Sequence, residues 1–273
     1  MSRLIYPKPQ PLPAGTAPIP RENIYGHLGR LEWLEQYIVR SDRAVEFGCG
    51  TGYMITYPLR ARGYDVIGVD IDLTSVEYGR GLLERAGIDP EALLAIDLRE
   101  LDGPFDAVIA SEVLEHLDND LLPNTLELIR GKLRPGGKLL VTVPNGWGWF
   151  ELEALLWNRL GAGALVQRRA ARGAAQGAFA QAKRQVTDAY VADACASTLA
   201  HSPHVQRFTL RSIRRTLAAH GFQIAEARGS VAICGPLSDL AFTGLGRFME
   251  HNRRLGRRLG PWAAGFYVAA VRP

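Results

Sequence analysis

The sequence predicts an α/β protein with a doubly wound parallel sheet, and three observations lead to this prediction. Short apolar runs alternate with stretches whose apolar residues recur at helical spacing. The first run passes into the glycine-rich residues 48–52, which is typical of a buried strand that turns sharply into a helix. Acidic residues directly follow the next two runs, at Asp70 and Asp97. Alternation of this kind builds parallel sheets that carry helices on both faces.

Length and composition limit the function classes. The 273 residues suffice for one large domain or two small ones, and 47% of them are hydrophobic. A net charge of +4 is mild for a nucleic-acid binder, so we expect nucleic acid to be an unlikely partner. The 3 cysteines form no CxxC pair and indicate neither a disulfide framework nor a zinc ribbon. Without a signal-peptide core or an apolar run of about 18 residues, we expect a cytoplasmic protein.

The chain before the first strand divides into an arm and a helix. Residues 1–20 are rich in proline, which removes backbone donors and fixes φ, so we expect an extended surface arm. From Ile24 to Ile38 the apolar residues recur at helical spacing, and this helix should lead into a strand at residues 43–47. We therefore place one domain at residues 21–273.

The segment AVEFGCGTGY, residues 44–53, predicts a ligand-binding turn. Because glycine has no Cβ, the backbone can approach a bound molecule closely, and free N–H groups at the next helix start point toward it. A dinucleotide fingerprint would need glycine at position 53, but the chain has Tyr53 there and its third glycine at Gly52. This spacing disfavours hydride transfer. A purely structural turn is the alternative.

Asp70 is the candidate ribose ligand. It ends the predicted strand at residues 66–69 and lies 20 positions after Gly50, the separation at which such folds place their ribose acid. The alternative is a helix N-cap, and we assign that role to Asp72 instead. The helix that follows the glycine turn contains Pro58, which should kink this helix or delay its regular part.

The remaining elements continue the alternation. Helices are expected at residues 121–132 and, behind the N-cap Thr209 and before Gly221, at 210–220. A turn at residues 134–138 should join the first of these helices to a strand. The further expected strands are residues 93–96, 105–111, 139–143, 222–227 and 265–272.

Three stretches carry a resemblance to a known family. The hxExGxGxG pattern that ends at Gly52 resembles the first motif of class I S-adenosylmethionine-dependent methyltransferases. FDAVIASEVLEHL and LRPGGKLLVTVPN resemble the ubiquinone-biosynthesis O-methyltransferase branch. The resemblance covers residues 44–145 and resumes at 202–228. It implies a Rossmann-like sheet whose seventh and last strand inserts antiparallel beside the sixth.

The resemblance also implies the cofactor and its site. S-adenosylmethionine would bind and S-adenosylhomocysteine would leave as product. Glu46 and the glycines would line the methionine end, Asp97 would receive the adenine amino group, and Leu98 would pack on the ring. A solvated loop aspartate is the alternative for Asp97, and a surface position near a helix start is the alternative for Tyr25 and for His27. The implied cofactor residues are Tyr25, Glu46, Gly48, Cys49, Gly50, Gly52, Asp70, Ile71, Asp97, Leu98, Ser111 and Glu112.

The chemistry is expected after the fourth strand, in the sequence SEVLEH that ends at His116. Methyl transfer is an in-line displacement, which requires alignment and an electron-rich acceptor. No Asn/Asp-Pro-Pro-aromatic motif stands here, which argues against exocyclic amines of DNA bases. A hydroxyl acceptor must lose a proton, and His116 is the candidate base. A histidine that only braces the loop is the alternative.

A divalent metal is a further hypothesis. Glu112, Glu115 and His116 lie within one turn of chain, and His204 returns to the sheet just before the next helix. The pattern resembles the metal-dependent small-RNA 2′-O-methyltransferases, whose ExxEH and downstream histidine hold magnesium or manganese. Oxygen and imidazole ligands together suit manganese, iron or zinc better than calcium. Glutamates that brace the loop are the alternative.

Two insertions interrupt the pattern, at residues 146–201 and 236–261. The first is about 55 residues long, a length that is usually functional, and we interpret it as a substrate lid. The second has an amphipathic basic pattern. Such surfaces favour an acidic substrate or peripheral contact with an anionic membrane, while a solvated helix face is the alternative.

Together these observations predict a methyltransferase that acts on a small-molecule hydroxyl or on a hydroxyl linked to a lipid or glycan. Two alternatives stay open. One is an RNA 2′-O-methyltransferase, although no single-strand stacking platform of aromatic and basic residues is evident. The other is a non-catalytic accessory protein that binds the cofactor without turnover.

Overall fold

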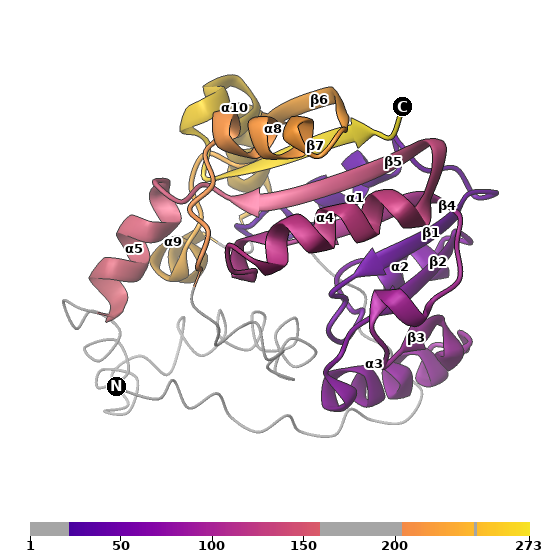
Figure 1. Cartoon of the computed structure of the whole chain (residues 1–273). Coiled ribbons are helices and arrows are strands. Elements are labelled where there is room, and N and C mark those ends of the chain that lie inside the picture. The colour runs from indigo at the N-terminus through magenta and orange to yellow at the C-terminus, as the bar shows by residue number, and fades with distance from the viewer. Residues whose placement is uncertain (1–21, 159–203, 243–244) are drawn as a thin grey trace.

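The computed structural model describes residues 22–158, 204–242 and 245–273 (Figure 1). The expected proline-rich arm at residues 1–20 lies outside these residues. So does most of the first insertion, including the greater part of the expected lid. No helix in the described ranges is long and apolar enough to cross a membrane.

The sheet has seven strands in the order β3-β2-β1-β4-β5-β7-β6. β7 is antiparallel to both of its neighbours, and the other pairs are parallel. The expected doubly wound sheet with an inserted antiparallel last strand is therefore confirmed. The strands are β1 Arg43–Phe47, β2 Asp65–Val69, β3 Leu93–Leu94, β4 Phe105–Ser111, β5 Leu133–Pro144, β6 Gln223–Gly229 and β7 Gly265–Val271.

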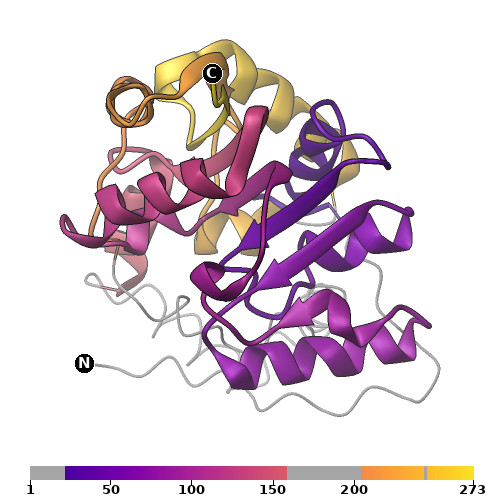
Figure 2. The same ribbon diagram turned by 45° about the vertical axis from the view of Figure 1, so that its right-hand side comes forward.

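Helices cover both faces of this sheet (Figure 2). On one face, Leu126 of α4 packs in a buried cluster that includes Val108 of β4. On the other face, Leu31 of α1 packs in a second cluster that includes Ile109. The helices are α1 His27–Leu34, α2 Thr56–Ala61, α3 Leu73–Arg85, α4 Leu121–Lys132, α5 Trp149–Asn158, α8 Leu210–Ala219, α9 Pro236–Phe242 and α10 Gly246–Leu259. Since successive strand residues point to opposite faces, β4 is buried on both sides, as expected of a central parallel strand.

The expected helix caps are present. Asp72 accepts a hydrogen bond from the Thr74 N–H at 3.3 Å and starts α3. Thr209 starts α8 in a capping box with Ser212. Pro58 lies in the first turn of α2, which begins only at Thr56, so the proline delays the helix as expected.

Several expected boundaries were wrong. α1 ends at Leu34 rather than Ile38, because the chain turns there toward β1. β3 has two residues instead of four, since the chain continues into the 3-10 turn Leu98–Glu100. The expected turn at residues 134–138 is instead a bulge inside β5, where the pairing with β4 jumps in register. Gly136 takes φ +76° there, which lets the strand resume against β7. The second insertion forms two helices, α9 and α10.

Candidate functional site

Two cavities lie side by side beyond the carboxyl ends of the parallel strands. The first has a volume of about 500 Å³ and the second about 340 Å³. Glu112 lines the second cavity and its neighbour Val113 lines the first, so the end of β4 separates them. The first is lined by Phe47, Gly48, Val69, Asp70, Ile71, Ile96, Asp97, Leu98, Arg99, Val113, Leu117, Leu121, Asn124, Thr125 and Leu128. The second is lined by Tyr25, Arg30, Glu112, Glu115, His116, Pro144, Phe150, His204, Ser230, Val231, Cys234, Ala264 and Gly265.

The glycine turn forms part of the floor of the first cavity. Gly48, Gly50 and Gly52 all have positive φ, at 71°, 53° and 65°. A Cβ on Gly48 would lie 2.6 Å from the Val113 Cγ2 atom, so only glycine allows the turn to pack this closely on the end of β4. The turn is tied to β2 because the Gly48 and Cys49 N–H groups both donate to the Val69 carbonyl.

Asp70 lies at the end of β2 and faces the same turn. Its Oδ2 accepts from the Gly50 N–H at 2.7 Å, and its Oδ1 accepts from the Asp72 N–H at 2.9 Å. Because a carboxylate offers about four acceptor positions, two of them stay available toward the cavity. Asp70 thus combines a fixed orientation with capacity for two further donors.

The far wall of the first cavity comes from the chain after β3. Leu98 is buried there, while Ile71 on the opposite side is exposed. Asp97 starts a 3-10 turn and pairs with the Arg99 guanidinium at 2.9 and 3.0 Å. The Arg99 hydrogen bonds lower the pKa of Asp97 below its usual range. The wall therefore presents an apolar surface with an ionised carboxylate at its edge.

Glu46 and Cys49 line neither cavity. Glu46 is buried, and its Oε2 accepts from the Thr56 N–H at 2.9 Å and from the Thr56 hydroxyl at 2.5 Å. Burial raises the pKa of Glu46 to about 7. Glu46 therefore holds the start of α2 from beneath the glycine turn.

Glu112 and Ser111 lie at the boundary between the cavities. Glu112 has φ +54°, and such a left-handed conformation in a residue other than glycine or asparagine is uncommon and is often found at functional sites. Its Oε1 accepts from the Thr142 hydroxyl at 2.8 Å and lies 3.4 Å from Arg30 Nη2. Arg30 also donates to the Ser111 hydroxyl at 2.9 Å. These bonds direct Glu112 toward Arg30 and Thr142.

Three of the four residues of the metal hypothesis lie together in the second cavity. Ligand atoms of Glu115, His116 and His204 all lie within 4.8 Å of one another. Glu112 is not in this group, because its carboxylate is engaged by Arg30 and Thr142. The sequence brought Glu115 and His116 together as neighbours, whereas only the fold brings His204 to them.

The backbone explains why His204 reaches this position. The Glu115 carbonyl accepts from the N–H groups of Val205 and Gln206 at 2.8 and 2.9 Å, which fixes the returning chain against the end of β4. His204 Nδ1 lies 3.2 Å from Glu151 Oε1 of α5, so its Nε2 is available to the cavity. Glu115 is buried, and its Oε2 has no hydrogen-bond partner among the residues that the structure describes. Burial raises the pKa of Glu115 well above its usual range, and the charge of Glu112 adds to the rise.

Some lining residues were not identified from the sequence, and one was assigned to the other cavity. Tyr25 lines the second cavity rather than the expected cofactor cavity. His27 is buried and lines neither of the two cavities. Arg30, Phe150 and Cys234 belong to the second cavity. Arg30 lies one turn after Gly26 on α1, and the sequence carries no signal that separates it from the other polar residues of this helix.

Comparisons with known proteins agree with this geometry. A family model described as a methyltransferase domain matches residues 28–227. A SAM-dependent methyltransferase from Archaeoglobus fulgidus is 17% identical, with a TM-score of 0.51 over 89% of this chain and 91% of that one. Magnesium protoporphyrin IX methyltransferase from Synechocystis with bound SAH is 16% identical, with a TM-score of 0.51 over 90% of this chain and 81% of that one. At such identities the structures establish the fold.

Curated relatives match a smaller part of the chain. A ribosomal protein L11 methyltransferase from Shewanella piezotolerans is 30% identical over 144 residues, 48% of this chain and 48% of that protein. The protein of the same name from Ralstonia pickettii is 33% identical over 116 residues, 41% of this chain and 35% of that protein. The chain thus spans about half or less of the relatives' length. The ubiquinone-type branch is not among these findings. The family model covers most of the chain, so this protein belongs to the methyltransferase-domain family.

Proposed function

We propose that the first cavity holds S-adenosylmethionine and that the second holds the methyl acceptor. Asp70 would accept the ribose hydroxyls, and Asp97 and Leu98 would receive the adenine. Ile71 lines the same cavity, and the turn at Gly48 lets the ligand approach the backbone. The bound cofactor supplies an electrophilic methyl group. The single observation that carries the proposal is that two adjacent residues after β4, Glu112 and Val113, line different cavities.

The acceptor cavity favours O-methylation. It contains His116, whose neutral imidazole can remove a hydroxyl proton at neutral pH. His116 Nε2 lies 3.9 Å from Glu115 Oε1, so a carboxyl group lies near the imidazole. We therefore assign His116 as general base. The acceptor is a hydroxyl on a small molecule, or one linked to a lipid or glycan.

The same cavity fits a divalent cation. One carboxylate oxygen and two imidazole nitrogens converge, and the buried Glu115 Oε2 atom has no hydrogen-bond partner within the described part of the chain. This donor set suits manganese, iron or zinc. Glu115, His116 and His204 would hold the ion, and it would lower the pKa of an acceptor hydroxyl as zinc lowers that of water.

Product release tests the reaction. The purified protein is incubated with S-adenosylmethionine and a panel of phenolic, glycan and lipid-linked hydroxyl compounds, each paired with the amine of the same skeleton. Release of S-adenosylhomocysteine with a hydroxyl and loss of that release in His116→Ala support O-methylation. Turnover only with the amines would contradict it, and tight cofactor binding without any turnover would favour the accessory-protein alternative.

A manganese-binding experiment distinguishes the metal hypothesis from the hypothesis that His116 acts alone as the general base. Calorimetry with Mn²⁺ alone should detect binding that Glu115→Gln and His204→Gln abolish and that Glu112→Gln retains, since Glu112 is bonded to Thr142 instead. Full turnover in excess EDTA, with no metal in the purified protein by elemental analysis, would remove the ion and leave His116 as the sole base.

A protein acceptor is the second candidate. It is favoured by the relatives named as ribosomal protein L11 methyltransferases, which match about two fifths to half of this chain. Incubation with purified ribosomal protein L11 and labelled cofactor tests it, with intact-mass analysis to count added methyl groups. The small-molecule panel in the same experiment decides between the two acceptor classes.

An anionic or lipid-associated acceptor would also account for the basic surface of the second insertion. α10 contains five arginines and a single glutamate. Arg257 and Arg258 are exposed close to the exposed side chains of Leu255 and Trp262. Co-sedimentation with vesicles of anionic lipid should detect binding that weakens as salt rises and that Arg257→Glu with Arg258→Glu abolishes. Absent or salt-independent binding would leave this face as a solvated surface.

A further inference from the structure

α10 holds the chain segment that leads into α1. Asn252 of α10 is buried, and its Nδ2 donates to the carbonyls of Ile24 at 3.3 Å and Ile233 at 2.8 Å. Its Oδ1 accepts from the N–H groups of Ala232 and Ile233 at 3.1 and 2.9 Å. One side chain thus joins segments more than 200 residues apart in sequence.

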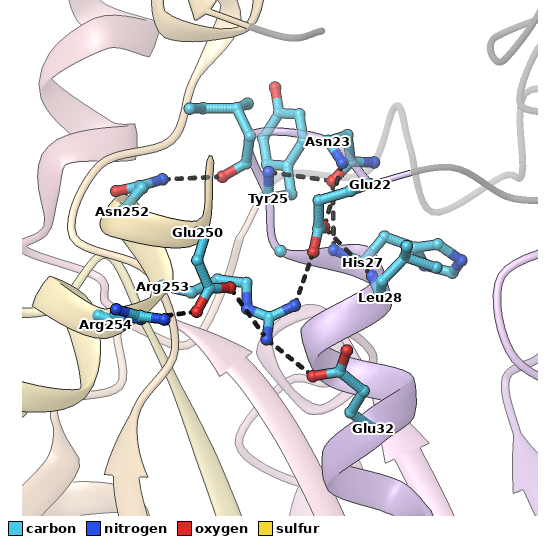
Figure 3. A network of polar contacts seen from close by, with 12 residues as sticks. Glu22, Asn23, Tyr25, His27, Leu28, Glu32, Glu250, Asn252, Arg253 and Arg254 are labelled. Carbon is cyan, nitrogen blue, oxygen red and sulfur yellow. Dashed lines mark hydrogen bonds and ion pairs between the residues drawn. The ribbon is translucent and has the colours of Figure 1, made fainter. Parts of the chain in front are cut away.

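Arg253, the next residue, binds the same segment through charge. Figure 3 shows its guanidinium among carboxylates that come from the chain before α1, from α1 and from α10. The bonds run to Glu22 at 3.0 Å, Glu32 at 2.7 Å and Glu250 at 3.5 Å. Glu22 in turn accepts from the Asn23 and Leu28 N–H groups, so the charge holds the first turn of α1 in place.

Glycines allow this close contact. A Cβ on Gly29 would lie 2.9 Å from Arg253 Nε, and a Cβ on Gly26 would lie 2.7 Å from Val231 Cγ1. A Cβ on Gly256 of α10 would lie 2.3 Å from the Val231 backbone. The packing of α10, α1 and the chain after β6 is therefore tight enough to fix their relative positions.

The two segments that α10 joins both line the acceptor cavity. Tyr25 follows Ile24 directly, and Arg30 lies one turn into α1. Val231 and Cys234 flank the residues that Asn252 binds. Ile24 packs against Val231 and Cys234 in one buried cluster. Movement of the Ile24 segment away from Val231 and Cys234 would therefore open the cavity at this contact.

We propose that Asn252 and Arg253 are positioning residues that set the width of the acceptor cavity. They act through Tyr25 and Arg30 on one wall and through the chain at Val231 on the other. The role of the cavity as an acceptor site rests on the proposed function. The contacts of Asn252 and Arg253 with the two wall segments, which we call the clamp, do not. The second insertion, which contains α10, therefore supports the acceptor cavity and leaves the cofactor cavity untouched.

Alkylation of Cys234 by iodoacetamide tests the clamp without a known acceptor. Cys234 is buried in the acceptor cavity, and Cys49 lies in the glycine turn as an internal reference within the same chain. Peptide mass spectrometry gives both rates. Arg253→Ala should raise the Cys234 rate about tenfold relative to Cys49, because local opening becomes easier. Arg253→Lys, which keeps the charge, should give an intermediate rate. S-adenosylhomocysteine affinity by calorimetry should stay within about twofold.

Arg254→Ala is the matched control. Arg254 is the next arginine of α10 and pairs with Glu250 at 2.7 Å on an exposed face, so its loss should leave both rates unchanged. If Arg253→Ala fails to fold, Glu22→Gln removes one partner of the same clamp and should give the same direction. A wild-type rate at Cys234 would overturn the proposal, as would equal acceleration at Cys49 with loss of cofactor affinity. If the Cys234 rate rises as expected in Arg253→Ala but no acceptor is methylated, the proposed function is refuted and the clamp is not.

Discussion

At the scale of single residues, the candidate site depends on which polar atoms are already bonded and which face a cavity. Asp70 and Glu46 are both carboxylates near the glycine turn, yet only Asp70 lines the cofactor cavity. Glu46 instead accepts hydrogen bonds from the N–H and the hydroxyl of Thr56 beneath the turn. Two residues of the same chemical type thus have different roles, and each role gives its own test.

Asp70→Ala should weaken S-adenosylhomocysteine binding by about ten- to a hundredfold, because a charged acceptor of two hydroxyl donors is lost. NAD should not bind the wild-type protein measurably, since position 53 is Tyr53 rather than glycine. Calorimetry measures both. Asp72→Ala, which removes only the α3 cap, is the control and should lower stability without changing affinity. Unaltered affinity in Asp70→Ala would disprove the ribose assignment.

Glu46→Gln should change how stability depends on pH. The folded pKa of about 7 lies above the unfolded value, so the folded state holds an extra proton between about pH 4.5 and 7. This residue therefore favours unfolding increasingly as pH rises through that range, by up to about 3 kcal/mol. Gln keeps an acceptor for Thr56 and has no proton to lose. Urea unfolding at pH 5 and pH 8 should show the variant gaining stability relative to wild type at pH 8, and an equal difference at both pH values would refute this.

At the scale of elements, the turn between β1 and α2 combines backbone conformation with close packing. Gly48 has positive φ, and its Cα faces Val113 at the end of β4. The turn therefore joins β1 to the strand that separates the cavities. The geometry of the turn therefore depends on β1, on α2 and on the end of β4 together, and not on the glycine motif alone.

Gly48→Ala should lower both stability and cofactor affinity, because the new Cβ meets Val113 Cγ2 at 2.6 Å beside the cavity. Gly87→Ala is the matched control, since Gly87 has a similar φ of 69° but nothing within 4 Å of an added Cβ. The control should lose only about 1 kcal/mol for the left-handed conformation and keep its affinity. Chemical denaturation and calorimetry on both variants test this, and equal effects at the two positions would contradict it.

At the scale of the whole molecule, the described parts of the two insertions are joined to each other. Glu153 of α5 is buried and accepts from the N–H groups of Leu237 and Ser238 at 2.8 Å each. It also accepts from the Ser238 hydroxyl and from the Trp149 indole. The carboxylate thus sits at the N-terminus of α9, where the helix dipole favours negative charge. It ties the start of the first insertion to the second.

Glu153→Ala should lower the free energy of unfolding by about 2–4 kcal/mol, because several buried donors lose their acceptor together. Glu127→Ala on the exposed face of α4 is the control and should change stability by less than about 0.5 kcal/mol. Urea titration of both variants provides the measurement. A loss in Glu153→Ala no larger than in the control would show that the insertions do not depend on this junction.

Local sequence patterns were sufficient for most strands of the sheet, because the signals that specify a strand are short-range, whereas the antiparallel insertion of the last strand was implied by the family resemblance. Apolar runs marked the buried strands, and the caps Asp72 and Thr209 marked helix starts. The position of Asp70 at the end of β2 also followed from spacing alone, since parallel strands bring their carboxyl ends to one edge. The same local rules misplaced the bulge at Gly136, because only pairing with β4 and β7 extends β5 through a sequence typical of a turn.

Most of the second cavity was decided by tertiary structure, because its parts come from positions far apart in the chain. The resemblance to metal-dependent methyltransferases predicted His204 beside Glu115 and His116, and the structure adds that the Glu115 carbonyl accepts from the Val205 N–H and so holds the returning backbone there. Arg253 reaches Glu22 across most of the sequence, and no periodicity links the two. The sequence by itself determined the strands and the edge of the sheet where the first cavity lies, since these depend on neighbours in the chain, and its motifs indicated the methyltransferase family. Which residues wall the second cavity depended on packing between distant elements, where long-range contacts override local pattern.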